Sequence, residues 1–171
     1  HTITINGFSK AYAMTGWRIG YAAGPENLIA GMVKLQSQMT SNIDAIAQYA
    51  GLEALNGPQD TIGKMVEKFD ERRKYLVARL NAMPGVKCQM PKGAFYALPD
   101  FSALIGKKYK SKELTSGVDI SAFLLDAAHI ATVAGEAFFI PNHVRFAYSN
   151  SLENIKAAMD QMEAALRLLE D

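Results

Sequence analysis

Residues 7–21, GFSKAYAMTGWRIGY, decide how this chain is interpreted. They set Lys10 and Arg18 among glycines, hydroxyl side chains and aromatic residues, shortly after a strand-like sequence at residues 2–5. A lysine becomes a nucleophile when a neighbouring cation or burial lowers its pKa, and an arginine guanidinium matches a phosphate dianion. Such a pair suits a cofactor that carries both an aldehyde and a phosphate. By spacing alone, however, a surface lysine and an arginine at the start of a strand are the commoner outcome.

The first part of the chain has two predicted strands and three predicted helices. Alternation of polar and apolar residues predicts strands at residues 2–5 and 18–24, which we expect to belong to an incomplete parallel sheet. Pro25 is typical of the first turn of a helix, and a helical period then runs to Met39. Further helices are predicted at residues 43–55, with a face of small residues, and at residues 60–83.

The rest of the chain alternates short strands with helices, which predicts the α/β class. Asn150 followed by Glu153 resembles a capping box, so the final helix is predicted to begin after Asn150. The lysine-rich residues 106–117 are interpreted as a solvated loop. The predicted strands are residues 86–90, 94–101, 131–135 and 143–149, with a helix at residues 120–129.

Composition narrows the function classes. The net charge of +1 gives no reason to expect nucleic acid or an anionic membrane as a partner, and no apolar run approaches the ~20 residues of a membrane span. No signal peptide is visible at the start. The single cysteine, Cys88, excludes a disulfide framework and a cysteine-rich metal site within these 171 residues, and is interpreted as a structural thiol. A reducing cytoplasm fits this cysteine usage.

Residues 9–21, SKAYAMTGWRIGY, closely resemble the cofactor-lysine motif of the class I/II (fold-type I) pyridoxal-phosphate-dependent aminotransferases. The longer stretch NGFSKAYAMTGWRIGYAAGP is most similar to the bacterial aspartate aminotransferase branch. The resemblance implies that Lys10 bonds covalently to pyridoxal 5'-phosphate and that Arg18 binds its phosphate. Many members have a serine where Gly7 stands, which removes one phosphate hydrogen bond, and Ser9 is expected to contribute instead.

Two later stretches continue the resemblance. PKGAFYALPDF, at residues 91–101, is similar to a segment that borders the substrate in the small domain. VAGEAFFIPNHVRFAYSNS is similar to the segment whose arginine grips the substrate carboxylate, here Arg145. On a strand Arg145 shares a face with small residues, which leaves its side chain room, although from the residues alone a plain surface arginine is the commoner outcome. Relatives often have proline where Ala134 stands and glycine where Phe139 stands.

The resemblance implies the C-terminal part of a PLP-dependent transferase fold. Residues 1–59 would be the incomplete end of the large cofactor-binding domain, and residues 60–171 the connecting helix and the small α/β domain. The implied activity is amino-acid transamination of the aspartate/2-oxoglutarate type, without a metal, in a cytoplasmic homodimer of the full-length protein. The resemblance places no carboxylate for the cofactor nitrogen within this chain, so the 171 residues alone are expected to be inactive.

Two alternatives stay open at this stage. One is another fold-type I enzyme, such as an aromatic or alanine aminotransferase or an aminocyclopropane-carboxylate synthase. The other is a non-catalytic, aminotransferase-like effector-binding domain of a transcriptional regulator.

Overall fold

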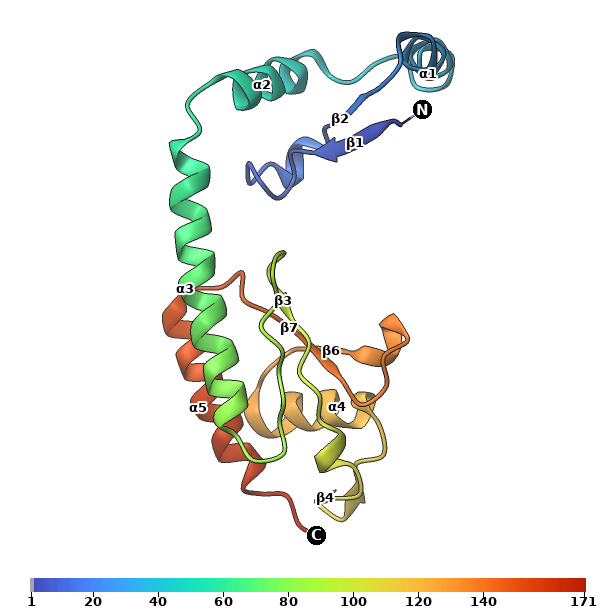
Figure 1. Cartoon of the computed structure of the whole chain (residues 1–171). Helices are drawn as coiled ribbons and strands as arrows, with labels where there is room; N and C mark the ends of the chain where they lie inside the picture. The colour runs from blue at the N-terminus through green and yellow to red at the C-terminus, as the bar shows by residue number, and fades with distance from the viewer. Residues whose placement is uncertain (1) are drawn as a thin grey trace. The chain divides into compact units, whose positions relative to one another are not determined.

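The computed structural model describes residues 2–171, and the chain divides into two compact units, His1–Met65 and Val66–Asp171. The division lies inside α3 (Asp60–Ala82), the long helix that the sequence predicts at residues 60–83 (Figure 1). Helices alternate with short strands, so the α/β class is confirmed. The assignment of residues 1–59 and 60–171 to a large and a small domain stays a prediction. Among the helices of residues 2–171, none has the length and apolar character that a bilayer span requires.

The first unit opens with an antiparallel pair of strands, β1 (Thr4–Gly7) and β2 (Gly20–Ala23), shown in blue in Figure 1. The two strands run antiparallel to each other, so the expectation that both run in one direction in a parallel sheet is wrong. Their connection, residues 8–19, consists of turns and the short 3-10 helix η1 (Thr15–Trp17), and it lacks the crossover helix that usually joins parallel strands. The chain therefore folds straight back on itself.

Two helices follow the strands, α1 (Glu26–Met39) and α2 (Ala45–Asn56). The small-residue face predicted for α2 is confirmed, since Ala47 and Gly51 are its buried residues. A Cβ atom at Gly51 would lie only 2.9 Å from Cδ1 of Ile19 and 3.4 Å from Cζ of Phe8. The absence of a side chain at Gly51 thus allows α2 to lie close to both ends of the β1–β2 connection.

The second unit is built on a three-stranded antiparallel sheet in the order β3-β7-β6. Helix α4 packs against α5 and the sheet, and α5 runs beside the C-terminal half of α3 (Figure 1). Arg79 of α3 joins this helix to α5 through ion pairs with Asp160 at 2.8 Å and Glu163 at 3.2 Å. The elements of the sheet and its helices are β3 (Tyr96–Ala97), η2 (Ser102–Leu104), α4 (Gly117–Ala128), β6 (Val133–Ala134), η3 (Gly135–Phe138), β7 (Val144–Ala147) and α5 (Leu152–Leu166).

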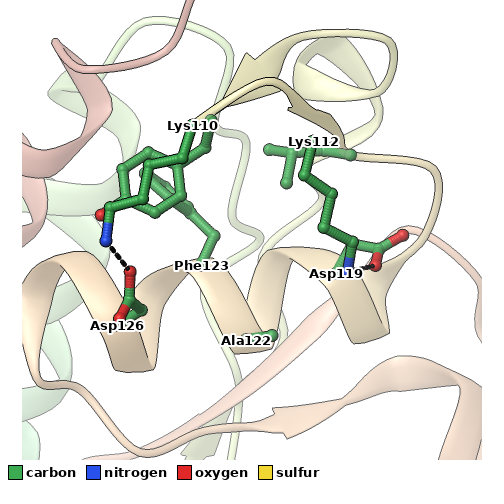
Figure 2. Close-up of a pocket in the computed structure, with 8 residues that line it drawn as sticks. Lys110, Lys112, Asp119, Ala122, Phe123 and Asp126 are labelled. Atoms are coloured by element: carbon green, nitrogen blue, oxygen red, sulfur yellow. Dashed lines mark hydrogen bonds and ion pairs between the residues drawn. The ribbon is translucent and has the colours of Figure 1, made fainter.

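The predicted loop at residues 106–117 instead contains a hairpin, β4 (Lys108–Tyr109) and β5 (Lys112–Glu113). Two ion pairs join this region to α4: Lys110 with Asp126 and Lys112 with Asp119, each at 2.8 Å (Figure 2). The helix begins at Gly117 rather than at residue 120, because Ser116 caps it by accepting a hydrogen bond from the backbone N–H of Asp119.

Two further predictions are wrong in detail. Residues 86–90 form no strand apart from a single bridge between Lys87 and Asp100, because the side-chain amide of Asn81 bonds both backbone groups of Cys88, at 2.8 and 2.9 Å. The N-cap of α5 is Ser151, whose Oγ accepts from the N–H of Asn154, and not Asn150.

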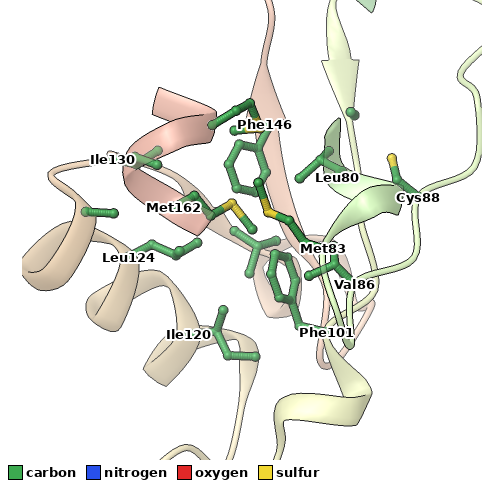
Figure 3. Packing of buried hydrophobic residues seen from close by; sticks show 14 of the residues in the cluster. Leu80, Met83, Val86, Cys88, Phe101, Ile120, Leu124, Ile130, Phe146 and Met162 are labelled. Atoms are coloured by element: carbon green, nitrogen blue, oxygen red, sulfur yellow. The ribbon is translucent and has the colours of Figure 1, made fainter. Parts of the chain in front are cut away.

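The core of the second unit lies between the sheet and helices α3, α4 and α5 (Figure 3). Cys88 lies at its edge with 8% of its surface exposed, and burial raises the pKa of its thiol to about 11. The burial of this thiol agrees with the interpretation of Cys88 as a structural residue. Core residues with no exposed surface are Leu80, Phe101, Ile120, Leu124, Val144 and Met162.

Candidate functional site

Lys10 lies in the connection that joins β1 to β2, and its side chain is exposed. The backbone around it is held in consecutive turns, because the N–H of Tyr12 donates to the carbonyl of Phe8 at 3.2 Å and the N–H of Ala13 donates to the carbonyl of Lys10 at 3.3 Å. Ser9, beside it, is half-buried. The amine of Lys10 is therefore accessible to a ligand, while the backbone of this residue is held by the turns.

Phe8 fixes the start of this connection. Its ring is 2% exposed and contacts the rings of Tyr12 and Tyr21, with centroids 5.6 and 5.4 Å away. Its N–H donates to the carbonyl of Ile19 at 3.3 Å, which extends the strand pairing by one step beyond Gly7. A buried aromatic residue two positions before Lys10 therefore determines where the amine emerges.

Arg18 lies near the other end of the same connection, directly after η1. Its backbone has the left-handed conformation, with φ of 51°, which is costly for a residue with a side chain. Its Nη1 donates to the carbonyl of Thr15 at 2.9 Å, so the guanidinium curls back over the connection. Only part of its donor capacity is used there, since a guanidinium carries several N–H groups in one plane.

The donors on this connection suit a phosphorylated aldehyde. An amine can condense with the aldehyde, and a guanidinium fork can bind the phosphate together with a nearby hydroxyl such as that of Ser9. The structure brings Lys10, Ser9 and Arg18 onto one twelve-residue connection, residues 8–19. Pyridoxal 5'-phosphate is a cofactor with this pair of functional groups, so the residues present fit it.

Arg145 belongs to the other unit, on β7, the middle strand of its sheet. The predicted alternation along this strand is confirmed: Val144 and Phe146 are buried at 0% and 5% exposed, while Arg145 is half-buried on the opposite face. Pairing with β6 on one edge and β3 on the other fixes its backbone. Its side chain therefore projects from a firmly held strand.

Two aromatic rings contact the guanidinium of Arg145. Its Cζ lies 4.3 Å from the ring centroid of Tyr96 and 4.8 Å from that of Phe138, distances typical of cation–π contacts. Within residues 66–171 no other side chain or carbonyl bonds this guanidinium. Neither ring is identified as a site residue by the sequence alone, although each lies in a stretch that resembles the family: Tyr96 in residues 91–101 and Phe138 in the stretch that contains Arg145.

The pocket drawn in Figure 2 is a weaker candidate. It has a volume of about 230 Å³ and lies between the β4–β5 hairpin and α4. Its floor is apolar, with Ala122 and Phe123, and the two lysines at its rim are already paired with carboxylates of α4. Among residues 2–171 no group of His, Cys, Asp and Glu side chains is arranged to hold a metal ion.

The family model and the most similar curated relatives point to the same protein family. The family model for aminotransferase class I and II matches residues 1–162. The chain is 46% identical over 165 residues to an aspartate aminotransferase of Rhizobium meliloti (strain 1021), covering 96% of this chain and 40% of the relative. It is also 46% identical over 164 residues to an aspartate/prephenate aminotransferase of Cereibacter sphaeroides, covering 95% and 41%. The chain thus spans about 40% of the length of these curated relatives.

Solved structures agree with the sequence relatives. The crystal structure of the aspartate aminotransferase from Rhizobium meliloti matches with a TM-score of 0.93 and 45% identity, covering 99% of this chain and 42% of that one. The aromatic aminotransferase from Pyrococcus horikoshii OT3 matches with a TM-score of 0.83 and 36% identity, covering 97% and 43%. The expected fold, the C-terminal part of the PLP-dependent transferase fold, is thereby confirmed.

Proposed function

We propose a function for the whole protein from one premise: the chain belongs to the class I and II aminotransferase family. The function is transfer of an amino group between an amino acid and a 2-oxo acid with pyridoxal 5'-phosphate, of the aspartate/2-oxoglutarate type. The observation that carries the proposal is the presence of Lys10 and Arg18 on the single connection between β1 and β2. The family supports the reaction, and this arrangement supports the use of these two residues for it.

In this proposal Arg18 and Ser9 bind the phosphate of the cofactor, and the amine of Lys10 is its covalent attachment point. When bound, pyridoxal phosphate supplies an electron sink for the electron pair left at Cα of the amino acid. When it is not bonded to the cofactor, the amine of Lys10 would accept the proton from Cα of the amino acid as a general base, and the ammonium group so formed would serve as a general acid. Phe8 and the turns around Lys10 hold its backbone, so rotation of the side chain would carry the amine between its positions.

Arg145 binds the α-carboxylate of the substrate in this proposal. A planar guanidinium can hold a carboxylate through two parallel hydrogen bonds, which fixes the orientation of the amino acid as well as its position. Fixed orientation is a large part of what an enzyme adds to a reaction between two groups. The firmly paired strand β7 suits this task better than a loop would.

The whole protein is further proposed to be a cytoplasmic homodimer. Apolar side chains on α1 and α2 support association with further protein, whether the remainder of a longer chain or a second copy. Met39, Ile46 and Tyr49 have 75%, 70% and 75% of their surface exposed. Burial of side chains of this size is worth about 1.5–3 kcal/mol each, so the exposure of these side chains to water is unfavourable.

A second candidate is transamination of prephenate, since a relative at 46% identity is an aspartate/prephenate aminotransferase. The test is a coupled assay of the full-length, cofactor-loaded protein. Aspartate, alanine and phenylalanine are offered as donors, with 2-oxoglutarate and prephenate as acceptors. The proposal expects the highest kcat/KM for aspartate with 2-oxoglutarate. Faster reaction with phenylalanine or with prephenate would favour the alternatives, and binding without turnover of any pair would favour a regulatory domain.

A further inference from the structure

We propose that Tyr96 and Phe138 are positioning residues that hold the guanidinium of Arg145 between two ring faces and direct its N–H edge at the substrate carboxylate. The inference rests on the carboxylate-binding role proposed for Arg145. It is carried by the two ring contacts, at 4.3 and 4.8 Å, and by the absence of any other partner for that guanidinium within residues 66–171.

The two rings come from the two sides of the strand that carries Arg145. Tyr96 of β3 pairs directly with Ala147 of β7, so its side chain lies on the same face as Ala147 and as Arg145, two residues earlier. Phe138 ends η3, which follows β6 on the opposite edge of β7. The sheet order therefore supplies one ring from each neighbouring strand region.

Ring contacts of this kind leave the donors of the guanidinium available. All its N–H groups lie in the guanidinium plane, while the rings lie over its faces. An arginine side chain that is mobile loses rotamer entropy when it binds a carboxylate. Because the two rings already hold the side chain of Arg145, less entropy is lost on binding, and binding is stronger. The remaining open edge favours a planar anion that approaches in the guanidinium plane, as a carboxylate does.

Phe138 is held in place although 40% of its surface is exposed. The carboxylate of Glu136 accepts a 2.8 Å hydrogen bond from the N–H of Gly117, at the start of α4. The N–H of Gly135 donates to the carbonyl of His143 at 2.7 Å. Helix η3 is therefore tied both to the N-terminus of α4 and to the residues that lead into β7, and Phe138 with it.

The neighbouring residue provides a matched control. Phe139 has the same side chain as Phe138, but it is 96% exposed and makes no ring contact with Arg145. Phe138→Leu and Phe139→Leu therefore make the same chemical change, but only Phe138→Leu removes a contact with the guanidinium of Arg145.

The experiment uses the full-length, cofactor-loaded protein and compares Tyr96→Leu, Phe138→Leu and the double variant with Phe139→Leu and Tyr96→Phe. Succinate affinity is measured by calorimetry, and KM and kcat with aspartate. We expect succinate Kd and aspartate KM to rise about three- to fivefold for each single variant and about tenfold or more for the double variant. We expect kcat and cofactor affinity to change by less than about twofold. Phe139→Leu should match the parent protein, and Tyr96→Phe, which keeps a ring face over the guanidinium, should weaken succinate binding less than Tyr96→Leu does.

A fluorinated side chain separates ring electronics from packing. Pentafluorophenylalanine at position 138 keeps the ring shape but reverses the charge distribution over its face, and we expect the same weakening as for Phe138→Leu. This variant also gives the answer if leucine at 138 prevents folding.

The Arg145→Ala variant separates the positioning role of the two rings from the carboxylate-binding role of Arg145. If Arg145→Ala weakens succinate binding strongly while both leucine variants and the fluorinated variant bind like the parent, the positioning role is wrong and the proposed function stands. If Arg145→Ala leaves succinate binding unchanged, the carboxylate-binding role of Arg145 is itself wrong. A loss of cofactor affinity equal to the loss of succinate affinity in the ring variants would also overturn positioning, since it would indicate general distortion.

Discussion

The backbone N–H of Gly117 and Oε1 of Glu136 are joined by a 2.8 Å hydrogen bond, so a carboxylate from η3 lies on the N-terminus of α4. A negative charge is favourable at that end of a helix. The second oxygen of Glu136 lies so close to Gly117 that a Cβ atom there would be 2.6 Å from it, and 2.6 Å from the carbonyl oxygen of His143. The contact therefore depends on glycine at position 117.

We predict that Gly117→Ala destabilises the protein by about 2 kcal/mol, because the added methyl group displaces Glu136 or the backbone at His143. Chemical denaturation is the measurement. Gly63→Ala is the matched control, since a Cβ atom at Gly63 in α3 meets nothing within 4 Å and alanine favours the helix by up to about 1 kcal/mol. Equal effects of the two substitutions would contradict the role assigned to Gly117.

Asp119 gives a prediction about pH. Hydrogen bonds from Lys112 and from Thr115 hold the pKa of its carboxyl well below the usual value. A lowered pKa stabilises the folded state above the unfolded pKa of about 3.9, and this stabilisation is lost as the pH falls toward the folded value. Asp119→Asn should therefore cost about 1 kcal/mol at pH 7, and the difference from the parent should narrow below about pH 4.

Asp126→Asn is the control for that measurement. Asp126, on α4, also pairs with a lysine of the hairpin, but 57% of its side chain is exposed and the pair is solvated. Its replacement should change the denaturation midpoint far less than that of Asp119. A constant Asp119→Asn difference from pH 7 to pH 2 would argue that the carboxylate charge is not what stabilises α4.

Lys10 should be the residue that carries the cofactor. Borohydride reduction of the full-length, cofactor-loaded protein should fix a pyridoxyl group on Lys10, detectable by peptide mapping, because the amine on this connection is accessible. Lys10→Arg keeps the charge and should abolish the label, whereas Lys34→Arg, on the exposed α1, should not. Label on a different lysine of the parent protein would disprove the assignment.

Arg18→Lys should weaken binding of pyridoxal phosphate by about 1.5–3 kcal/mol, since lysine cannot offer two parallel hydrogen bonds to the phosphate. The measurement is cofactor dissociation from the full-length protein, followed by absorbance. Arg167→Lys is a control on a 75% exposed arginine that pairs with Glu163. Unchanged cofactor affinity in Arg18→Lys would remove Arg18 from the site.

The 171 residues alone should not transaminate. The connection that carries Lys10 is exposed, and water weakens the electrostatic contacts that a cofactor would need there. A cofactor nitrogen stays protonated in a site when a carboxylate lies close by, and the resemblance assigns none to this chain. The assay adds cofactor, aspartate and 2-oxoglutarate and measures oxaloacetate. Turnover comparable to that of the full-length protein would show that residues 1–171 suffice.

The sequence predicted best those features that depend on local periodicity. The small-residue face of α2 and the alternation along β7 both follow from side-chain spacing, and the structure agrees at Gly51 and Arg145. The prediction of a strand at residues 86–90 was wrong for a reason that the spacing of side chains cannot reveal. Its backbone groups at Cys88 are bonded by Asn81, a side chain from α3, rather than by a neighbouring strand.

The site was only partly predictable for a similar reason. Lys10, Ser9 and Arg18 could be named because they are close in sequence and match a family motif. Tyr96 and Phe138 lie far apart in sequence, and only the order β3-β7-β6 brings both rings to Arg145. The direction of β1 relative to β2 was missed because alternation of residues indicates a strand but not its partner.

The pairing of Gly7 with Gly20 sets a fixed span for the chain between them. Inside that span, the separation of Lys10 from Arg18 depends on how many residues lie between the two, and the paired strands cannot slip by one residue without reversing their faces. If Lys10 and Arg18 act together as proposed, an insertion or deletion there would alter the reach from the amine to the phosphate even if every side chain were kept. In that proposal the number of residues in this connection matters as well as their identity, because it sets how far apart the two side chains begin.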